Sequence, residues 1–227
     1  MSRRLLASAL PLLLLSAGCA QSVIGSPVAD PNPEFPPVDC EYTKDTSTAA
    51  AKPVEPPADG KVESYGTHTF VVKTNQGEME FELDAKSAPC TVHSFKYLVE
   101  KQYYLGTSCH RLTVQAFYLL QCGDAGATGR GTPGYQYDDP TATKTGFSRA
   151  VIAMANTREA GTNGSQFFIM HKDSLDITPD FPVFGTVTKG MSVIDKVAAG
   201  GVAKGTGSSD GEGRPSTPLK FESISEK

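Results

Sequence analysis

The chain has 227 residues and a formal charge of −4 at pH 7, with 39% hydrophobic and 20% charged residues, a balance that is ordinary for a soluble globular protein. Its 21 lysines and arginines are outnumbered by 25 aspartates and glutamates, and no basic stripe with interleaved aromatic residues is present. Because a nucleic-acid binder needs such a stripe to contact phosphates, that class of function is excluded.

The N-terminal stretch MSRRLLASALPLLLLSAGC joins two arginines to an apolar run and then to small residues. This pattern is typical of an export signal and is too short for a mature membrane-spanning helix. Its end, LSAGC, resembles the box of bacterial lipoprotein signals, in which the cysteine becomes the lipidated first residue. We therefore expect residues 1–18 to be removed and Cys19 to anchor the protein at the outer face of the cell membrane. An ordinary cleaved signal with an incidental cysteine is the alternative.

Residues 19–62 are rich in proline, small and charged residues, which cannot bury enough apolar surface to offset the entropy of the chain. We expect a lipidated N-terminus and a disordered tether there, followed by one folded domain over residues 63–227. HTFVVKTNQGEMEFELD predicts two strands around the turn at residues 75–77, because apolar and acidic residues alternate after it. SAPCTVHSFKYLVEKQYY predicts a helix that starts near Pro89, and GMSVIDKVAAG predicts a second, shorter helix.

Short apolar runs fill the remainder of the chain, at CHRL, AFYLLQC, RAVIAMA, SQFFIM, FPVFGTV and LKFESI. Many short strands separated by glycine and proline turns, with only two helices, favour a mainly β protein and a closed antiparallel barrel. The acidic stretch SSDGEGRPS near the end is expected to be a solvated turn before the closing strand.

Four cysteines follow Cys19, and four cysteines allow three pairings. Cys109 and Cys122 open and close what reads as a strand-loop-strand unit, so a cross-strand disulfide is geometrically reasonable. That leaves Cys40 with Cys90, a bond that would tie the tether to the start of the first helix. Two free thiols are the alternative for this second pair.

The usual catalytic sets are missing from the sequence. It contains no C-x-x-C and no histidine spacing typical of zinc. Cys109, His110, Cys122 and His171 could in principle form a tetrahedral metal site, but cysteines of exported proteins more often pair with each other. We therefore expect no metal and no other cofactor.

Four segments, CHRLTVQAFYLLQCGD, TGRGTPGY, AMANTREAGTNGSQFFI and FPVFGTV, follow one another in an order that is similar to the cyclophilin family of peptidyl-prolyl isomerases. The resemblance covers about residues 67–224. It implies an eight-stranded antiparallel barrel capped by two helices, with the active groove on its outer face. It also implies that the partners are proline-containing peptides and unfolded exported proteins, and nothing in the sequence calls for more than a monomer.

By the resemblance, Arg111 in HRL matches the catalytic arginine of the family, and Gln121 in QCGD matches the glutamine that orients the substrate and the arginine. Further positions match the groove that binds the proline ring and the peptide backbone: Tyr118, Leu119, Ala155, Asn156, Phe168 and Phe181.

An arginine suits this reaction because rotation about an X-Pro bond breaks no covalent bond and needs no nucleophile. The barrier of about 18–20 kcal/mol arises from delocalisation of the nitrogen lone pair into the carbonyl. A hydrogen bond to the prolyl nitrogen would hold the lone pair out of resonance and would act mainly in the twisted transition state. Arginine stays charged and offers five donors on a planar fork.

The sequence departs from the family pattern in three places. The interval between Arg111 and Gln121 is two residues longer than usual, and tyrosine and leucine stand where the family has phenylalanine and methionine. The chain has no tryptophan, whereas many cyclophilins place one beside the groove where it helps to bind cyclosporin. DSLDITPDF fills that region, with Leu175 or Ile177 as the substitute, so we expect weak cyclosporin binding and little loss of isomerase activity.

These observations favour a prolyl isomerase, anchored to the membrane, that assists the folding of exported proteins. The alternative is a proline-peptide binding module at the cell surface that has kept the groove and lost turnover. The longer loop favours this alternative, and the presence of Arg111 and Gln121 argues against it. A thiol redox protein using Cys109 and Cys122 is a third and weaker possibility, because no thioredoxin-like pattern is present.

Overall fold

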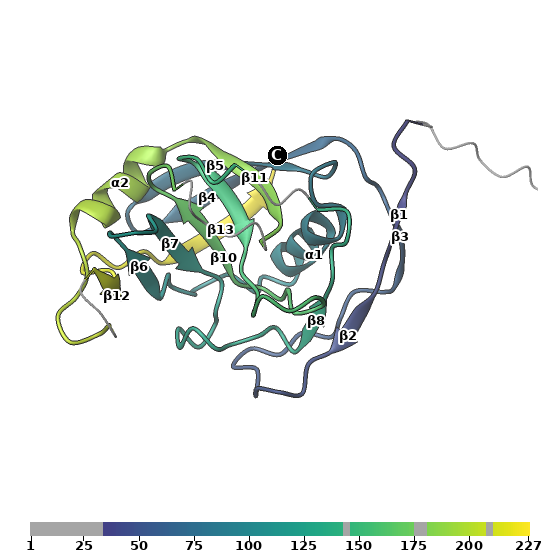
Figure 1. Ribbon diagram of the computed structural model, residues 1–227, viewed down its shortest axis with the longest axis horizontal. Helices are drawn as coiled ribbons and strands as arrows, with labels where there is room; N and C mark the ends of the chain where they lie inside the picture. The colour runs from purple at the N-terminus through teal and green to yellow at the C-terminus, as the bar shows by residue number, and fades with distance from the viewer. Residues whose placement is uncertain (1–33, 143–145, 175–180, 208–210) are drawn as a thin grey trace, which may run out of the picture. The chain divides into compact units, whose positions relative to one another are not determined.

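The structure is a computed structural model that describes residues 34–142, 146–174, 181–207 and 211–227, drawn in colour in Figure 1. These residues belong to one compact unit, Asn32–Lys227. It contains two helices, α1 (Pro89–Glu100) and α2 (Met191–Ala199). Neither helix of the described part is long and apolar enough to cross a lipid bilayer.

Nine strands form one curled antiparallel sheet in the order β12-β6-β7-β10-β9-β11-β5-β4-β13 (Figure 1). In chain order the strands are β4 (Thr67–Thr74), β5 (Gly77–Asp84), β6 (Arg111–Thr113), β7 (Leu119–Cys122), β9 (Val151–Met154), β10 (Phe167–Met170), β11 (Val183–Lys189), β12 (Glu212–Gly213) and β13 (Phe221–Glu226). The expected mainly β fold with two helices is confirmed. The strand number is nine rather than eight, and closure into a barrel is not confirmed.

The segments that lead into β6 and β13 lie side by side near the two ends of the sheet order. The backbone N–H of Cys109 donates to the carbonyl of Leu219 at 3.0 Å, and that of Phe221 donates to the carbonyl of Thr107 at 2.9 Å. These bonds bring together two segments more than a hundred residues apart in the sequence.

Strands β4 and β5 form the hairpin that the alternation of apolar and acidic residues predicts. The two strands pair along their whole length, from Thr67 opposite Asp84 to Thr74 opposite Gly77. The apolar members of β5 are fully buried, namely Met79, Phe81 and Leu83. A Cβ on Gly77 would lie 2.9 Å from the Val193 side chain of α2, so glycine is required at this turn.

Helix α1 packs its apolar side into the interior, where aromatic rings meet at edge-to-face angles. The ring of Phe95 lies within 5.5 Å of Phe70 and stacks at 5.1 Å on Tyr104. The helix begins at Pro89, as expected, and its N-cap residue makes no side-chain hydrogen bond. Instead, the buried carboxylate of Asp139 accepts the N–H of Thr91 at 2.8 Å and supplies a partner for the positive end of the helix.

Residues 34–62, which we call the strap, do not form the disordered tether that the composition predicts. They contain β1 (Val38–Cys40), β2 (Tyr42–Lys44) and β3 (Gly60–Val62). Strand β1 pairs with β3, and β2 pairs with β8 (Tyr135–Tyr137). The strap lies along the side of the fold where α1 is found (Figure 1). The boundary of the folded domain therefore lies before residue 38, not at 63.

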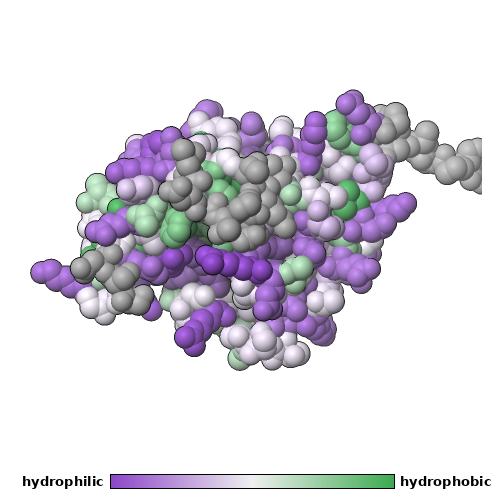
Figure 2. Space-filling model, viewed as in Figure 1, coloured by the Kyte–Doolittle hydropathy of each residue, from purple (hydrophilic) through white to green (hydrophobic). Residues whose placement is uncertain are grey.

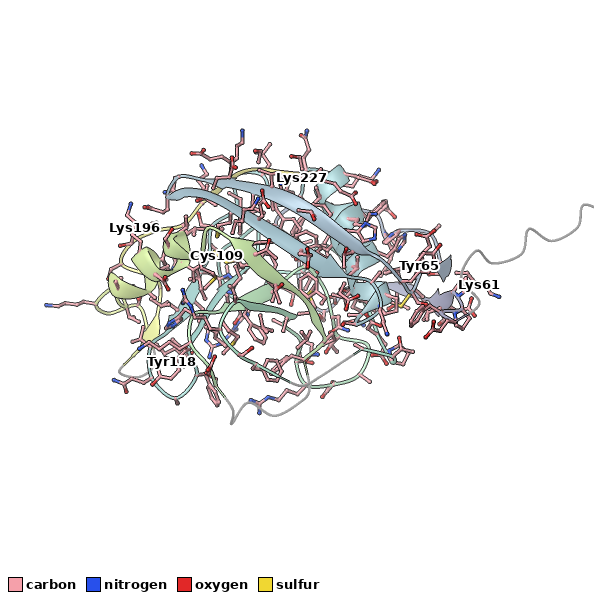
Figure 3. All side chains as sticks on the ribbon, turned by 90° about the horizontal axis from the view of Figure 1, so that it is seen from above. Lys61, Tyr65, Cys109, Tyr118, Lys196 and Lys227 are labelled. Carbon is pink, nitrogen blue, oxygen red and sulfur yellow. A yellow bond between two sulfur atoms is a disulfide. The ribbon has the colours of Figure 1, made fainter. Side chains whose placement is uncertain are left out.

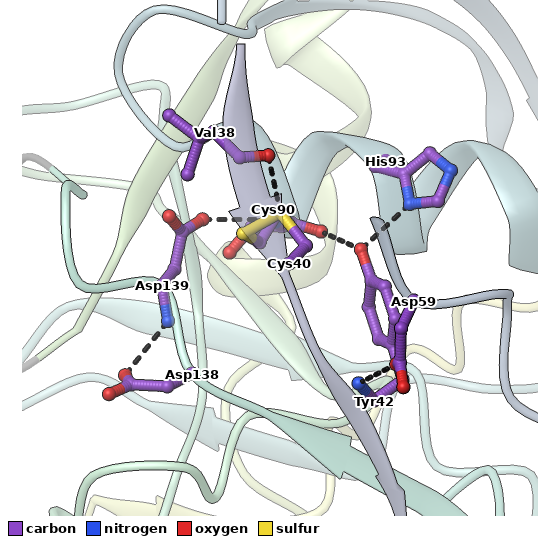
Figure 4. Close-up of a disulfide and its surroundings, with 9 residues drawn as sticks. Val38, Cys40, Tyr42, Asp59, Cys90, His93, Asp138 and Asp139 are labelled. Atoms are coloured by element: carbon purple, nitrogen blue, oxygen red, sulfur yellow. Dashed lines mark hydrogen bonds between the residues drawn. A yellow bond between two sulfur atoms is a disulfide. The ribbon is translucent and has the colours of Figure 1, made fainter. Parts of the chain in front are cut away.

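The expected Cys40–Cys90 disulfide is present in the structure and explains why the strap is ordered (Figure 4). It joins β1 to the first turn of α1, and next to it the hydroxyl of Tyr42 donates to the carbonyl of Cys90 at 3.3 Å and is hydrogen-bonded to Nδ1 of His93 at 2.7 Å. Cys40 and Tyr42 are both buried. The covalent link and these two buried side chains offset the chain entropy that the polar composition alone would leave unopposed.

Candidate active site

The candidate catalytic pair lies on two neighbouring strands. Arg111 of β6 is directly opposite Gln121 of β7, and its Nη1 donates to Oε1 of that glutamine at 3.1 Å. Gln121 in turn donates to Oε1 of Gln166 at 2.9 Å, and Gln166 donates to the carbonyl of Gly131 at 2.9 Å. The two residues thus share one chain of hydrogen bonds, and the longer segment between them has not separated them.

Glu212 also holds the arginine, and the sequence analysis did not identify it. Nε of Arg111 donates to Oε1 of Glu212 at 2.9 Å, in an ion pair whose members are about one-third exposed. Glu212 belongs to β12, which pairs with β6. The acidic stretch expected to be a solvated turn is therefore, in its described residues 211–216, part of the sheet edge and of the site. No local motif marks this contact, because the two residues are 101 positions apart.

The guanidinium retains donors for a ligand after these contacts. One N–H of Arg111 is used by Glu212 and another by Gln121, out of the five that arginine carries. The remaining three make no hydrogen bond with the described residues. The group is therefore fixed in orientation by two acceptors and can still donate into the groove.

A cavity of about 240 Å³, which we call the proline cavity, lies beside this pair. Its floor is Phe168, which is 3% exposed and whose ring lies 5.4 Å from that of Phe181, edge to face. These rings belong to an apolar cluster separate from the main core. The lining combines this apolar floor with polar and charged side chains: Arg111, Phe117, Leu119, Gln121, Ala155, Asn156, Arg158, Phe168 and Phe181. In Figure 2, apolar residues lie in small patches among hydrophilic ones on the face shown.

From the segment before β7, Phe117 lines the proline cavity, and Tyr118, which the resemblance placed there, is not among the lining residues. The ring of Tyr118 packs edge to face on His171 at 5.6 Å, and Figure 3 shows Tyr118 at the rim of the fold. Ala116 adopts a left-handed conformation with φ of +60°, which turns the longer segment just before the strand. Counting back from Gln121 by twos reaches Leu119 and then Phe117, so strand periodicity could have identified this residue.

The remaining expected residues lie at the edge of the cavity or outside the described part. Ala155 follows β9 and donates its N–H to the carbonyl of Gln166 at 2.8 Å. Asn156 donates to Oδ1 of Asn163 at 3.1 Å and lines the same cavity as Ala155. Leu175 and Ile177 lie outside the described residues, as does Cys19.

The glycine-rich segment after β7 wraps around the carboxylate of Asp124, which is fully buried. This carboxylate accepts the backbone N–H groups of Gly126, Thr128 and Gly129, each at 2.7 Å, and that of Gly131 at 3.2 Å. A Cβ on Gly131 would overlap the carboxylate. The glycines therefore let the backbone close around one anion, and this fixes the carbonyl of Gly131 that Gln166 contacts.

The Cys109–Cys122 disulfide is present next to the site, as expected from the strand-loop-strand pattern. Because both sulfurs are bonded, the tetrahedral metal site considered for Cys109 and Cys122 is wrong for this structure. In the described ranges, no group of three or more histidine, cysteine, aspartate or glutamate side chains is arranged to hold a metal ion. His110, between Arg111 and this disulfide, is buried, and burial lowers the pKa of its imidazole.

Comparison with known proteins agrees with these features. The sequence model of one family, described as "Cyclophilin type peptidyl-prolyl cis-trans isomerase/CLD", matches residues 69–226. The "Probable peptidyl-prolyl cis-trans isomerase B" of Mycobacterium leprae is 38% identical over 202 residues, which are 82% of this chain and 66% of that protein. The protein of the same description from Mycobacterium tuberculosis H37Rv is 36% identical over 216 residues, 86% of this chain and 68% of that protein. The chain thus spans about two thirds of the length of these relatives.

Among solved structures, a cyclophilin type peptidyl-prolyl cis-trans isomerase of Cryptosporidium parvum superposes with a TM-score of 0.60 at 24% identity, over 71% of this chain and 98% of that chain. A second structure of that protein, described as determined in the presence of the dipeptide Ala-Pro, gives a TM-score of 0.57 over 69% of this chain and 96% of that chain. At this identity the likeness shows the fold alone. Together with the match over residues 69–226, these comparisons establish that the chain belongs to the cyclophilin-type peptidyl-prolyl cis-trans isomerase family.

Proposed function

We propose that this protein catalyses rotation about X-Pro bonds in exported polypeptides and so assists their folding. The observation that carries the proposal is the position of Arg111, which is held by Glu212 and Gln121 at the polar side of an apolar cavity. A proline ring seated on Phe168 would bring its nitrogen to this side of the cavity.

The proposed mechanism requires only orientation and one charged donor. The proline ring enters the cavity, and a free N–H of Arg111 donates to the prolyl nitrogen as it becomes pyramidal. The nitrogen lone pair then no longer delocalises into the carbonyl, and the bond rotates. No covalent bond forms or breaks, so no nucleophile, metal or other cofactor takes part.

The size of the effect is consistent with one arginine. A hydrogen bond to a charged group contributes about 1.5–3 kcal/mol. Since each 1.36 kcal/mol of selective stabilisation is about tenfold in rate, this bond alone would supply roughly one to two orders of magnitude. The remainder would come from binding the proline ring and the flanking peptide in a twisted conformation.

We also propose that the protein works outside the cytoplasm, as a monomer anchored through a lipid at Cys19. Two features support this location. The N-terminal stretch has the pattern of a lipoprotein signal, and the folded unit contains two disulfides, which persist in oxidising compartments. Uncatalysed isomerisation takes tens to hundreds of seconds, so a catalyst at the site of export has an evident use. The absence of tryptophan supports the further proposal that cyclosporin binds weakly.

Magnetisation-transfer NMR of cis/trans exchange in an Ala-Pro peptide tests the proposal. We expect the purified protein to accelerate exchange and the Arg111→Ala variant to be at least about tenfold slower under saturating peptide. Arg149→Ala, which removes an exposed arginine that pairs with Asp195 and does not line the proline cavity, is the matched control and should keep the native rate. Peptide shifts on binding without faster exchange would overturn the isomerase proposal in favour of a proline-recognition module.

A further inference from the structure

The proline cavity does not end at Asn156. It shares three lining residues, Gln121, Ala155 and Asn156, with a second cavity of about 160 Å³, which we call the middle cavity. A third cavity of about 370 Å³, the far cavity, continues from the middle one. Those two have five lining residues in common: Arg130, Thr132, Thr157, Thr162 and Gly164. The three cavities form one continuous groove that leaves the proline cavity at a single edge.

The strap forms part of the outer wall of this groove. Asp45, Ser47 and Thr48 line the far cavity, and these residues precede the 69–226 segment that matches the family. The strap also holds the loop that carries Arg130, since Asp45 donates its N–H to the carbonyl of Gly134 at 3.0 Å and Val54 donates to that of Pro133 at 2.8 Å. The loop at residues 130–134 is therefore fixed from outside by the strap.

The charges along the groove change sign in a definite order. Among the described residues, no carboxylate lines the proline or the middle cavity. Arg111 is paired with Glu212, whereas Arg130 and Arg158 are exposed and form no ion pair with the described residues. Asp45 and Glu159 line the far cavity, so the positive stretch ends there. Arg130 lines the middle cavity, and Arg158 lines the adjoining proline cavity. An anion would therefore be attracted where these two cavities meet and repelled farther along the groove.

Arg158 is held in an unusual backbone conformation at this place. Its φ is +68°, in the left-handed region that residues other than glycine rarely adopt. Its N–H donates to Oδ1 of Asn156 at 2.9 Å, which stabilises the turn beside the proline cavity. Strained backbone of this kind concentrates at sites where a side chain must be aimed.

We propose that the middle cavity is a substrate subsite that selects an acidic side chain, aspartate or glutamate, within a few residues of the X-Pro bond and on one side of it. Arg130, which lines the middle cavity, and Arg158, which lines the adjoining proline cavity, are its specificity-determining residues. Because only one edge of the proline cavity opens into the middle cavity, an acidic residue on the other side of the proline gains nothing. This inference rests on the proposed function, since it assumes that the groove takes X-Pro peptides.

The test uses the purified protein and a set of Ala-Pro peptides of equal length. Each carries glutamate, glutamine or lysine two residues before or two residues after the proline. Dissociation constants come from isothermal titration calorimetry, and exchange rates for the same peptides come from NMR. We expect the glutamate peptide of one series to bind about fivefold tighter than its lysine counterpart at low salt. The other series should show less than a twofold difference.

Charge variants assign the preference to named residues. The double variant Arg130→Gln/Arg158→Gln should abolish the glutamate preference, so that the glutamate, glutamine and lysine peptides of each series bind with equal affinity. Lys61→Gln removes an exposed positive charge from β3 of the strap, outside the groove, and should leave the preference intact. The preference should also weaken at 0.5 M salt, where exposed charges are screened.

Equal affinity for glutamate and lysine peptides in both series, or a preference that survives the double variant, would overturn the subsite. If exchange is accelerated equally for all peptides, the isomerase proposal stands without the subsite. Selective binding of glutamate peptides with no acceleration of exchange has the opposite meaning, since the subsite then stands and the isomerase proposal fails.

Discussion

Glu212 accepts a hydrogen bond from Nε of Arg111 at 2.9 Å and so determines how the guanidinium faces the groove. Replacing it with glutamine removes the charge and keeps an acceptor of the same shape. We expect the Glu212→Gln variant to lose about fivefold in kcat, because a charge-assisted bond becomes a neutral one. KM should change less than twofold, since the apolar cavity is intact.

Separate measurement of kcat and KM on one Ala-Pro peptide distinguishes a role of Glu212 in positioning Arg111 from a role in binding the substrate. Glu222→Gln on the exposed side of β13 is the matched control and should leave both parameters unchanged. A fall in thermal stability with kcat unaltered would show that Glu212 only supports the fold.

Phe117 is 37% exposed and lines the proline cavity, whereas Tyr118 does not. We expect Phe117→Ala to raise KM about tenfold, because part of the apolar surface that covers the proline ring is lost. Tyr118→Ala should change KM less than twofold. The two variants, assayed together by the same exchange experiment, decide which aromatic residue contacts substrate. The reverse ranking would restore the position implied by the family resemblance.

The two disulfides should differ in what they contribute to stability. Cys40–Cys90 closes a loop of 50 residues and Cys109–Cys122 a loop of 13. By loop entropy, Cys40→Ala/Cys90→Ala should lower the free energy of unfolding by about 4 kcal/mol and Cys109→Ala/Cys122→Ala by about 3 kcal/mol. Guanidinium unfolding followed by circular dichroism measures both. A loss below about 1 kcal/mol for the first pair would mean that the strap is held by its strands and Tyr42 alone.

Buried histidines predict a loss of stability in mild acid. Burial lowers the pKa of His110 and of His171, and for His110 the carboxylate of Asp124 opposes this effect only in part. With a folded pKa below the unfolded value of about 6.5, the unfolded state binds more protons in this range. The stabilisation is therefore complete above about pH 6.5 and is lost as the pH falls through the folded pKa.

We expect the free energy of unfolding to decrease steadily from pH 7 to pH 5, and His110→Gln to reduce that slope. His68→Gln, at an exposed ion pair with Glu226, serves as a comparison at a surface site. A native protein with constant stability over this interval would contradict the role assigned to burial.

Much of the fold follows from local patterns. The alternation of apolar and polar residues predicted the hairpin of β4 and β5, because one face of each strand must be buried. Pro89 marked the start of α1. The motif resemblance located Arg111, Gln121 and Phe168, whose spacing within two strand pairs is fixed by register. These features depend on neighbours in sequence or in an adjacent strand, so a single sequence contains the information.

The features that sequence missed depend on distant segments. Glu212 reaches Arg111 only because β12 adds to the edge of β6, and no periodic pattern marks a two-residue strand. The strap has the composition of a tether, and its order comes from a covalent bond with a partner 50 residues away and from strand pairing with distant β8. Phe117 is an exception, because counting back by twos from Gln121 along the strand could have identified it.

The Cys40–Cys90 bond also limits how far the enzyme can work from its anchor. If the proposed lipid is attached at Cys19, only 40 − 19 = 21 residues separate the membrane surface from the first covalently fixed point of the folded unit. Fully extended, these residues span at most about 70 Å. A free chain to residue 62 would have roughly doubled this radius. With that anchor, the groove would be confined to a thin layer above the bilayer, and its clients would be polypeptides still close to the membrane they had just crossed.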